Sequence, residues 1–74
     1  MFRVVVYAES QNGNNTASIG FKKRNIQNAQ NVAMQRINEF RMAGGFIRYR
    51  IKIWNDNRYE DENSIPEMDS NWFN

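Results

Sequence analysis

Residues 46–54 read Phe-Ile-Arg-Tyr-Arg-Ile-Lys-Ile-Trp, in which apolar and basic residues alternate. Alternation predicts a β-strand, because successive side chains of a strand point to opposite faces of a sheet. One predicted face carries only large apolar side chains: Ile47, Tyr49, Ile51 and Ile53. The other face carries three cations between two aromatic residues: Phe46, Arg48, Arg50, Lys52 and Trp54. This strand therefore predicts a buried side and a basic side for the sheet.

The segment before this strand has the spacing of a helix. Its apolar residues recur at intervals of three and four: Ile26, Ala29, Ala33, Ile37 and Phe40. This spacing predicts an amphipathic helix over residues 26–43, with Asn25 as its N-cap and its end at Gly44-Gly45.

Residues 2–9 and 16–22 predict two more strands, joined by a turn over residues 10–15. That turn contains Asn12-Gly13, a dipeptide that favours a tight hairpin. Because residues 2–9 are apolar on both faces, we expect this strand in the middle of the sheet. A crossover through the helix then sets residues 46–54 beside it. The prediction is an α+β fold of order ββαβ, with a three-stranded antiparallel or mixed sheet (order 2-1-3) and one helix on one face.

We expect residues 1–54 to form the domain and residues 55–74 to form an acidic tail. The tail contains Ser64-Ile65-Pro66-Glu67, which has the pattern of a capping box with proline at the first helical position. This pattern predicts a short helix over residues 65–73.

Charge divides the chain in the same place. Residues 1–54 contain nine Lys/Arg and two acids, a net charge of +7, whereas residues 55–74 contain one Arg and six acids, a net charge of −5. A basic body with an acidic end indicates contact with a polyanion or with a charge-matched protein.

Composition excludes most catalytic classes. The chain has no Cys and no His, so thiol nucleophiles, imidazole catalysis, disulfides and Cys/His zinc sites are absent. No glycine-rich phosphate loop and no long apolar segment is present. We expect a cytoplasmic, non-catalytic protein without cofactor, metal, membrane or small-molecule partner.

A basic sheet face suits nucleic acid, since cations neutralise phosphates and aromatic rings stack on bases. The predicted nucleic-acid-binding residues are Arg48, Arg50, Lys52, Lys22, Lys23, Arg24, Arg3, Tyr7 and Trp54. Three of them, Lys22-Lys23-Arg24, directly precede the helix, where free N–H groups could help to hold an anion. The alternative for the basic strand of residues 46–54 is that it is a solvated edge strand whose charges prevent pairing with other chains.

The tail combines acids with terminal aromatic residues. Its predicted protein-partner residues are Glu60, Asp61, Glu62, Glu67, Asp69, Trp72 and Phe73. In style it resembles the acidic tails of single-stranded-DNA-binding proteins, which dock on partners and compete for a basic face. The alternative is that Ile65, Met68 and Trp72 fold back over apolar surface while the acids pair with the cations of residues 48–52.

Two functions follow from these patterns. The leading one is binding of nucleic acid, or of a nucleoprotein complex, through the basic sheet face. The other is inhibition of a host nucleic-acid enzyme or defence system, with the acidic tail as a phosphate mimic. Small, Cys-free, Asn-rich chains of this kind resemble accessory proteins of phages and mobile elements, including anti-CRISPR proteins. Homodimerisation through the edge of residues 46–54 is compatible with either function.

Overall fold

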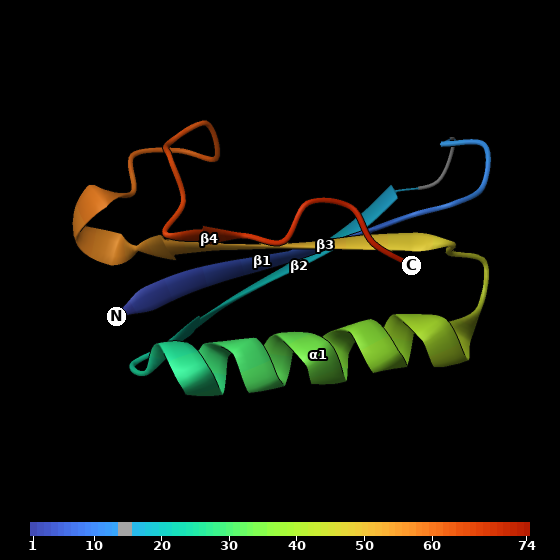
Figure 1. The fold of residues 1–74 in the computed structure, drawn as a ribbon, viewed down its shortest axis with the longest axis horizontal. Helices are drawn as coiled ribbons and strands as arrows, with labels where there is room; N and C mark the ends of the chain where they lie inside the picture. The colour runs from blue at the N-terminus through green and yellow to red at the C-terminus, as the bar shows by residue number, and fades with distance from the viewer. Residues whose placement is uncertain (14–15) are drawn as a thin grey trace.

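Strand β1 (Phe2–Glu9) is the centre of the sheet, as its two apolar faces predicted. In the computed structural model, which describes residues 1–13 and 16–74, β1 pairs antiparallel with both β2 (Thr16–Lys23) and β3 (Arg48–Asn55). A short fourth strand, β4 (Met68–Asp69), continues the sheet, whose order is β2-β1-β3-β4 (Figure 1). The predicted α+β fold and the order 2-1-3 are therefore confirmed, and the described part of the chain adds one strand.

The β1–β2 connection begins with a turn at the predicted dipeptide. The N–H of Gly13 donates to the carbonyl of Ser10 at 3.0 Å, and Gly13 has a φ of 72°, which glycine adopts without steric cost. Residues 14 and 15 of the predicted turn lie outside the described residues.

Helix α1 (Ile26–Ala43) has the predicted bounds because both of its ends are capped. The side-chain oxygen of Asn25 accepts hydrogen bonds from the N–H groups of Gln27 and Asn28, at 2.8 and 3.2 Å. At the other end Gly44 has a φ of 79° and donates its N–H to the carbonyl of Phe40. No helix in the described part of the chain has the length and apolar character needed to cross a membrane.

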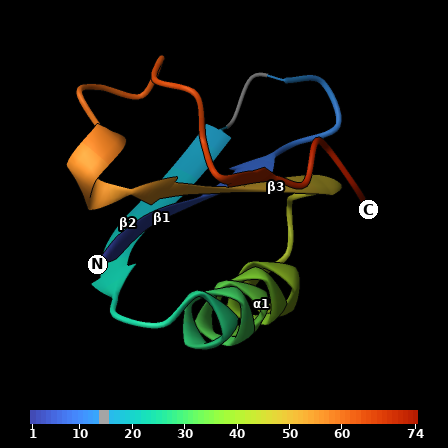
Figure 2. The same ribbon diagram turned by 60° about the vertical axis from the view of Figure 1, so that its left-hand side comes forward.

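The core lies between α1 and the sheet (Figure 2). It is formed by alternate residues of β1 and β3 and by the apolar stripe of the helix: Val4, Val6, Ala8, Ala29, Ala33, Ile37, Tyr49, Ile51 and Ile53. From β2, the partly buried Phe21 packs against this core. Because directly opposite residues in an antiparallel pair share a face, the intervening residues of β1, β2 and β3 lie on the other face of the sheet. We call this the open face.

Residues 65–73 do not form the predicted helix. Residues 68–73 run antiparallel along the outer edge of β3, where Tyr49 and Phe73 exchange backbone hydrogen bonds of 2.7 and 2.8 Å. The hydroxyl of Ser64, which was expected to cap a helix, instead accepts from the N–H groups of Glu60 and Asp61 in the preceding turn. A helix of nine residues is marginal in water, whereas the β3 edge supplies partners for the same backbone groups.

The tail also covers Trp54, which the sequence placed on an exposed basic face. Trp54 is fully buried, its indole N–H donates to the carbonyl of Ser64 at 2.7 Å, and Tyr59 packs edge-on against it at 5.4 Å between ring centroids. The expectation that Trp54 is available to stack on bases is therefore wrong. Trp54 does lie on the open face, but it is buried there because the tail passes over it.

Replacing Asn25 by Ala should destabilise the protein by about 0.5–2 kcal/mol, because two N–H groups at the start of the helix lose their acceptor. Asn28→Ala is the matched control: this residue is exposed within the helix, and Ala has the higher helix propensity. Urea unfolding followed by circular dichroism measures both. Equal effects of the two substitutions would contradict the capping role.

Deleting residues 55–74 should leave a chain that is unfolded or far less stable, because it exposes Trp54 and the unpaired edge of β3. Burial of one large side chain contributes about 1.5–3 kcal/mol, and a small domain has only about 5–15 kcal/mol in total. Urea unfolding of the 1–54 chain against the full chain measures the loss. An unchanged unfolding midpoint would mean that the tail is dispensable for folding.

Candidate binding surface on the open face

The register of the sheet brings most of the predicted basic residues onto the open face. Arg3 of β1 lies opposite Lys22 of β2, and Val5 and Tyr7 of β1 lie opposite Lys52 and Arg50 of β3. The β1–β3 pairing also sets Glu9 opposite Arg48. Cations from three strands therefore share one surface, and the tail lies over part of it (Figure 1).

On the β3 side of this surface both arginines are engaged within the chain. Arg50 makes a two-pronged pair with Asp69, with Nε–Oδ1 at 2.9 Å and Nη2–Oδ2 at 2.6 Å. Arg48 donates to Glu9 at 2.5 and 3.0 Å, and its guanidinium lies over the ring of Trp72, 4.6 Å from the centroid. A phosphate would have to displace a carboxylate from either arginine.

Lys52 differs from these arginines. In residues 1–13 and 16–74 no carboxylate forms an ion pair with it. Its Nζ lies 5.8 Å from the centroid of the Tyr7 ring. Lys52 and Tyr7 thus present a cation and an aromatic ring side by side.

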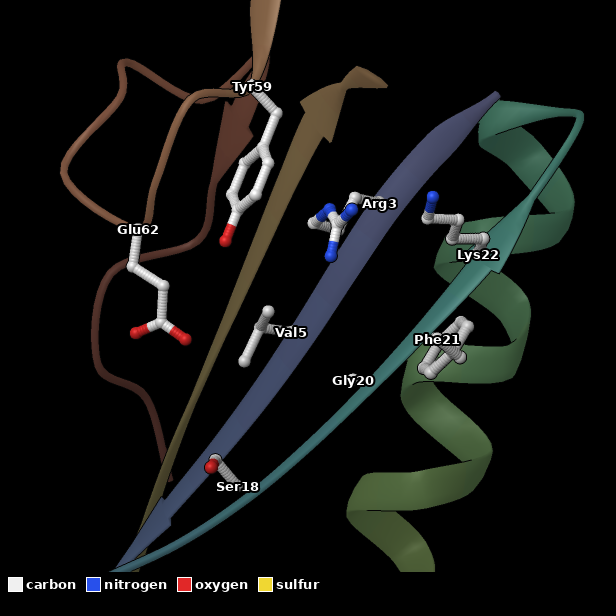
Figure 3. Close-up of a pocket in the computed structure, with 8 residues that line it drawn as sticks. All are labelled: Arg3, Val5, Ser18, Gly20, Phe21, Lys22, Tyr59 and Glu62. Atoms are coloured by element: carbon white, nitrogen blue, oxygen red, sulfur yellow. The ribbon is translucent and has the colours of Figure 1, made fainter.

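Over β1 and β2 the open face forms a groove of about 380 Å³, shown in Figure 3. Its floor is low because it consists of Val5, Ser18 and Gly20, and Gly20 has no side chain. Tyr59 and Glu62 border it from the tail, and Arg3 and Lys22 project on the same side of the sheet. We call this the β1–β2 groove.

The two cations of the groove share one carboxylate. Lys22 Nζ lies 3.1 Å from Asp56 Oδ2, and Arg3 Nε lies 3.5 Å from Asp56 Oδ1, too far for a strong hydrogen bond. The hydrogen bond from Lys22 is the main reason why the pKa of Asp56 is lowered. The Arg3 guanidinium also stacks on the Tyr59 ring, 4.1 Å from its centroid. Both cations are therefore held in place but keep about a third to a half of their side chains exposed (34% and 46%).

Glu62 brings a negative charge into this surface. It lines the β1–β2 groove and also a neighbouring hollow of about 210 Å³ between Lys52 and Trp72. The hydroxyl of Tyr7 lies 3.4 Å from its carboxylate. Burial of the phenol, reinforced by the Glu62 charge, raises the pKa of Tyr7 to about 12. Tyr7 therefore remains a neutral hydrogen-bond donor.

The run Lys22-Lys23-Arg24 does not act as one cluster. Lys22 turns to Asp56, whereas Lys23 and Arg24 form no ion pair with the described residues. Two N–H groups at the start of α1 are already bound by Asn25. The helix start therefore offers an anion fewer donors than the sequence suggested.

The tail residues separate into those that contact the rest of the fold and those that lie on an exposed turn. Asp69 pairs with Arg50, Glu67 lies 3.2 Å from Arg58, and Phe73 packs on Tyr49 with 6.2 Å between centroids. Glu60 and Asp61 are exposed on the turn that Ser64 holds. The fold-back alternative thus describes Met68, which packs on the core, but not Ile65, which is 89% exposed.

Three contributors to this surface were missed by the sequence reasoning: Glu9, Asp56 and Tyr59. From the sequence, Glu9 and Asp56 were counted only as charges, and Tyr59 had no expected role. No local sequence pattern identifies these three residues, because their neighbours depend on how the strands pair and on the path of the tail over the sheet. Within the described residues, no group of three acidic side chains is suited to hold a metal ion.

Comparison with known proteins adds no relative: no protein-family model, no curated protein and no solved structure matches this chain.

Replacing Asp69 by Asn should destabilise the fold by about 1–2 kcal/mol at neutral pH, because it breaks the partly buried pair with Arg50. The hydrogen bonds from Arg50 lower the pKa of Asp69 from 3.8 to about 2. The stabilisation is therefore complete above about pH 4 and is lost as the pH falls toward 2. Urea unfolding at a series of pH values measures the difference between the two proteins.

Glu39→Gln is the control, because it removes an acid from the exposed Arg36–Glu39 pair and should cost less than about 0.5 kcal/mol. A difference between Asp69→Asn and the parent chain that persists undiminished at pH 2 would contradict this assignment.

Proposed function

We propose that this protein is a non-catalytic binding protein that engages nucleic acid, or a nucleoprotein complex, through the part of its open face that carries Arg3, Lys22 and Lys52. One observation carries the proposal: Arg3, Lys22 and Lys52 lie on one surface with the rings of Tyr7 and Tyr59. Cations at the sides of a shallow groove suit a phosphate backbone, and partly exposed rings suit unstacked bases.

The favoured cations differ in part from those that the sequence emphasised. Arg48 and Arg50 are matched by Glu9 and Asp69 at close range, so their contribution to phosphate binding must be reduced by the cost of displacing those acids. Lys52 has no such partner among the described residues, and Lys22 shares Asp56 with Arg3. The proposed contacts are therefore Arg3, Lys22 and Lys52.

Glu62 has a defined part in this proposal. Its carboxylate lies in the surface between the groove and the hollow beside Lys52, where it would repel an incoming phosphate. Its hydrogen bond with the Tyr7 hydroxyl is long at 3.4 Å. Displacing this side chain should therefore cost little, and a bound phosphate would replace one anion by another.

No element of the fold reads base sequence in this proposal. The helix α1 covers the opposite face, and the polar side chains of the groove are two cations, a phenol, a hydroxyl and a carboxylate, with no side-chain amide among them. Phosphate contacts position a nucleic acid without specifying its bases. We therefore expect weak sequence preference.

The test is fluorescence anisotropy of labelled single- and double-stranded DNA and RNA, titrated with the full chain at several salt concentrations. Lys22→Gln should weaken binding and reduce the log–log salt slope by about 0.7 to 0.9, the change expected for one lost phosphate contact. Glu62→Gln should strengthen binding. Arg36→Gln is the matched control, because it removes a similarly exposed cation from helix α1.

Absence of binding by the parent chain and by Glu62→Gln would overturn the nucleic-acid proposal. If Lys22→Gln and Arg36→Gln weaken binding equally, the binding would reflect general charge attraction and not the proposed surface.

A second candidate function is inhibition of a nucleic-acid enzyme, with the acidic tail of this protein bound in the basic channel of that enzyme. The observation in its favour is a built acidic turn: Glu60 and Asp61 are exposed, and the Ser64 hydroxyl binds the N–H groups of both. Glu62 follows directly and is exposed as well. Such a turn could imitate successive phosphates. Glu62→Gln distinguishes the two functions, because it should weaken inhibition of such an enzyme but strengthen binding of nucleic acid.

A further inference from the structure

The two edges of the sheet are protected very differently. The outer edge of β3 is covered by residues 68–73, with hydrogen bonds at Tyr49 and Ile51. Strand β2 is the last strand on the other side, and in the described part of the chain no other strand pairs with its outer edge. The edge that the sequence suggested for dimerisation, that of residues 46–54, is therefore occupied, while an eight-residue edge is open.

The backbone groups that β2 directs outward follow from the hydrogen bonds of the other strands. Asp56 donates its N–H to the carbonyl of Met1, which continues the β1–β3 register, so odd-numbered residues of β1 bond to β3. Even-numbered residues of β1 must then bond to the odd-numbered residues of β2. The outward N–H and C=O groups of β2 are therefore those of four residues: Thr16, Ser18, Gly20 and Lys22.

The side chains of β2 do not block another strand. Natural edge strands are usually protected by proline, bulges, short length or charges in the middle of the strand. Strand β2 has none of these within its eight residues, and its two lysines lie at one end. Ile19, at its centre, is 38% exposed on the helix side of the sheet, with Ala17 and Phe21 on the same side.

We propose that β2 pairs antiparallel with β2 of a second copy of this chain, about a two-fold axis at Ile19. This register is the one that pairs all four outward residues: Ser18 lies opposite Gly20 of the other copy, and Thr16 lies opposite Lys22. A shift of the axis by one residue would leave part of the strand unpaired. The product is a continuous eight-stranded sheet with both helices on one side.

The paired side chains are compatible in this register. Ile19 meets its own symmetry mate, and Ala17 meets Phe21, so the helix side of the contact is apolar. On the open face each lysine at position 22 meets a threonine rather than another cation. Like charges opposite one another would destabilise a strand pair, and this register avoids them.

The two helices do not collide. Neighbouring strands are about 4.8 Å apart, so the two β1 strands, under which the helices lie, are separated by about 14 Å. Packed helices need about 8–10 Å between their axes. The remaining space is of the size that Ile19 and its neighbours can fill.

Sedimentation velocity over a wide concentration range tests the proposal, and it does not depend on the proposed function. The parent chain should show a monomer–dimer equilibrium. Ile19→Lys and Ile19→Glu should each abolish the dimer, because each sets two like charges at the axis, and their mixture should restore it as a heterodimer. Ile65→Lys, at a residue that is 89% exposed and remote from β2, should leave dimerisation unchanged.

Single introduced cysteines also test the register, because the chain has no Cys of its own. This test does not require the charged Ile19 variants to fold. Ile19→Cys should oxidise to a disulfide-linked dimer, because Cα atoms in such a cross-strand pair are about 4.5 Å apart. Ser18→Cys should not, because the two Cα atoms would be about 8 Å apart. A monomeric parent chain at every concentration, or equal cross-linking at both positions, would overturn the proposal.

Discussion

The structure depends on the pairing of residues 68–73 with the outer edge of β3. Tyr49 and Phe73 exchange backbone hydrogen bonds, and the Ser70 hydroxyl accepts from the N–H of Ile51. This pairing fixes the course of the residues before it, which cover Trp54 and let Ser64 accept its indole N–H. A single small helix and three strands bury limited surface, so the return of the chain completes the fold on the side that the helix does not reach.

This pairing also explains what becomes of the opposed charges. The acids of the tail are brought over the cations of the sheet, and Asp69 with Arg50 and Asp56 with Lys22 form close pairs. Such pairs contribute at most about 1–2 kcal/mol each, and the partly buried Asp69–Arg50 pair lies at the upper end of this range. The pairs also affect binding: Asp69 neutralises Arg50, whereas the single carboxylate of Asp56 is shared by Lys22 and Arg3 and leaves an excess of positive charge there.

The periodicities of the sequence predicted β1 and α1 with their observed bounds, since Asn25 and Gly44 mark the helix ends locally. The fourth strand was not predictable in this way. Ser64-Ile65-Pro66-Glu67 has a genuine local helix signal, but the open edge of β3 is a long-range partner that no local pattern records. The burial of Trp54 was missed for the same reason: alternation gives its face, whereas its exposure depends on Tyr59 and Ser64.

The position of the tail determines which part of the molecule stays available. Because the tail leaves the sheet at the end of β3 and returns along that strand, it covers the β3 side of the open face and the β3 edge together (Figure 2). Strand β2 lies farthest from it, and within residues 1–13 and 16–74 no strand pairs with its outer edge. Ser18, Gly20 and Lys22 belong to both surfaces: their side-chain positions line the β1–β2 groove, and their backbone groups point outward. A second copy on this edge would therefore join two grooves into one longer surface, with the Lys22 residues about 20 Å apart.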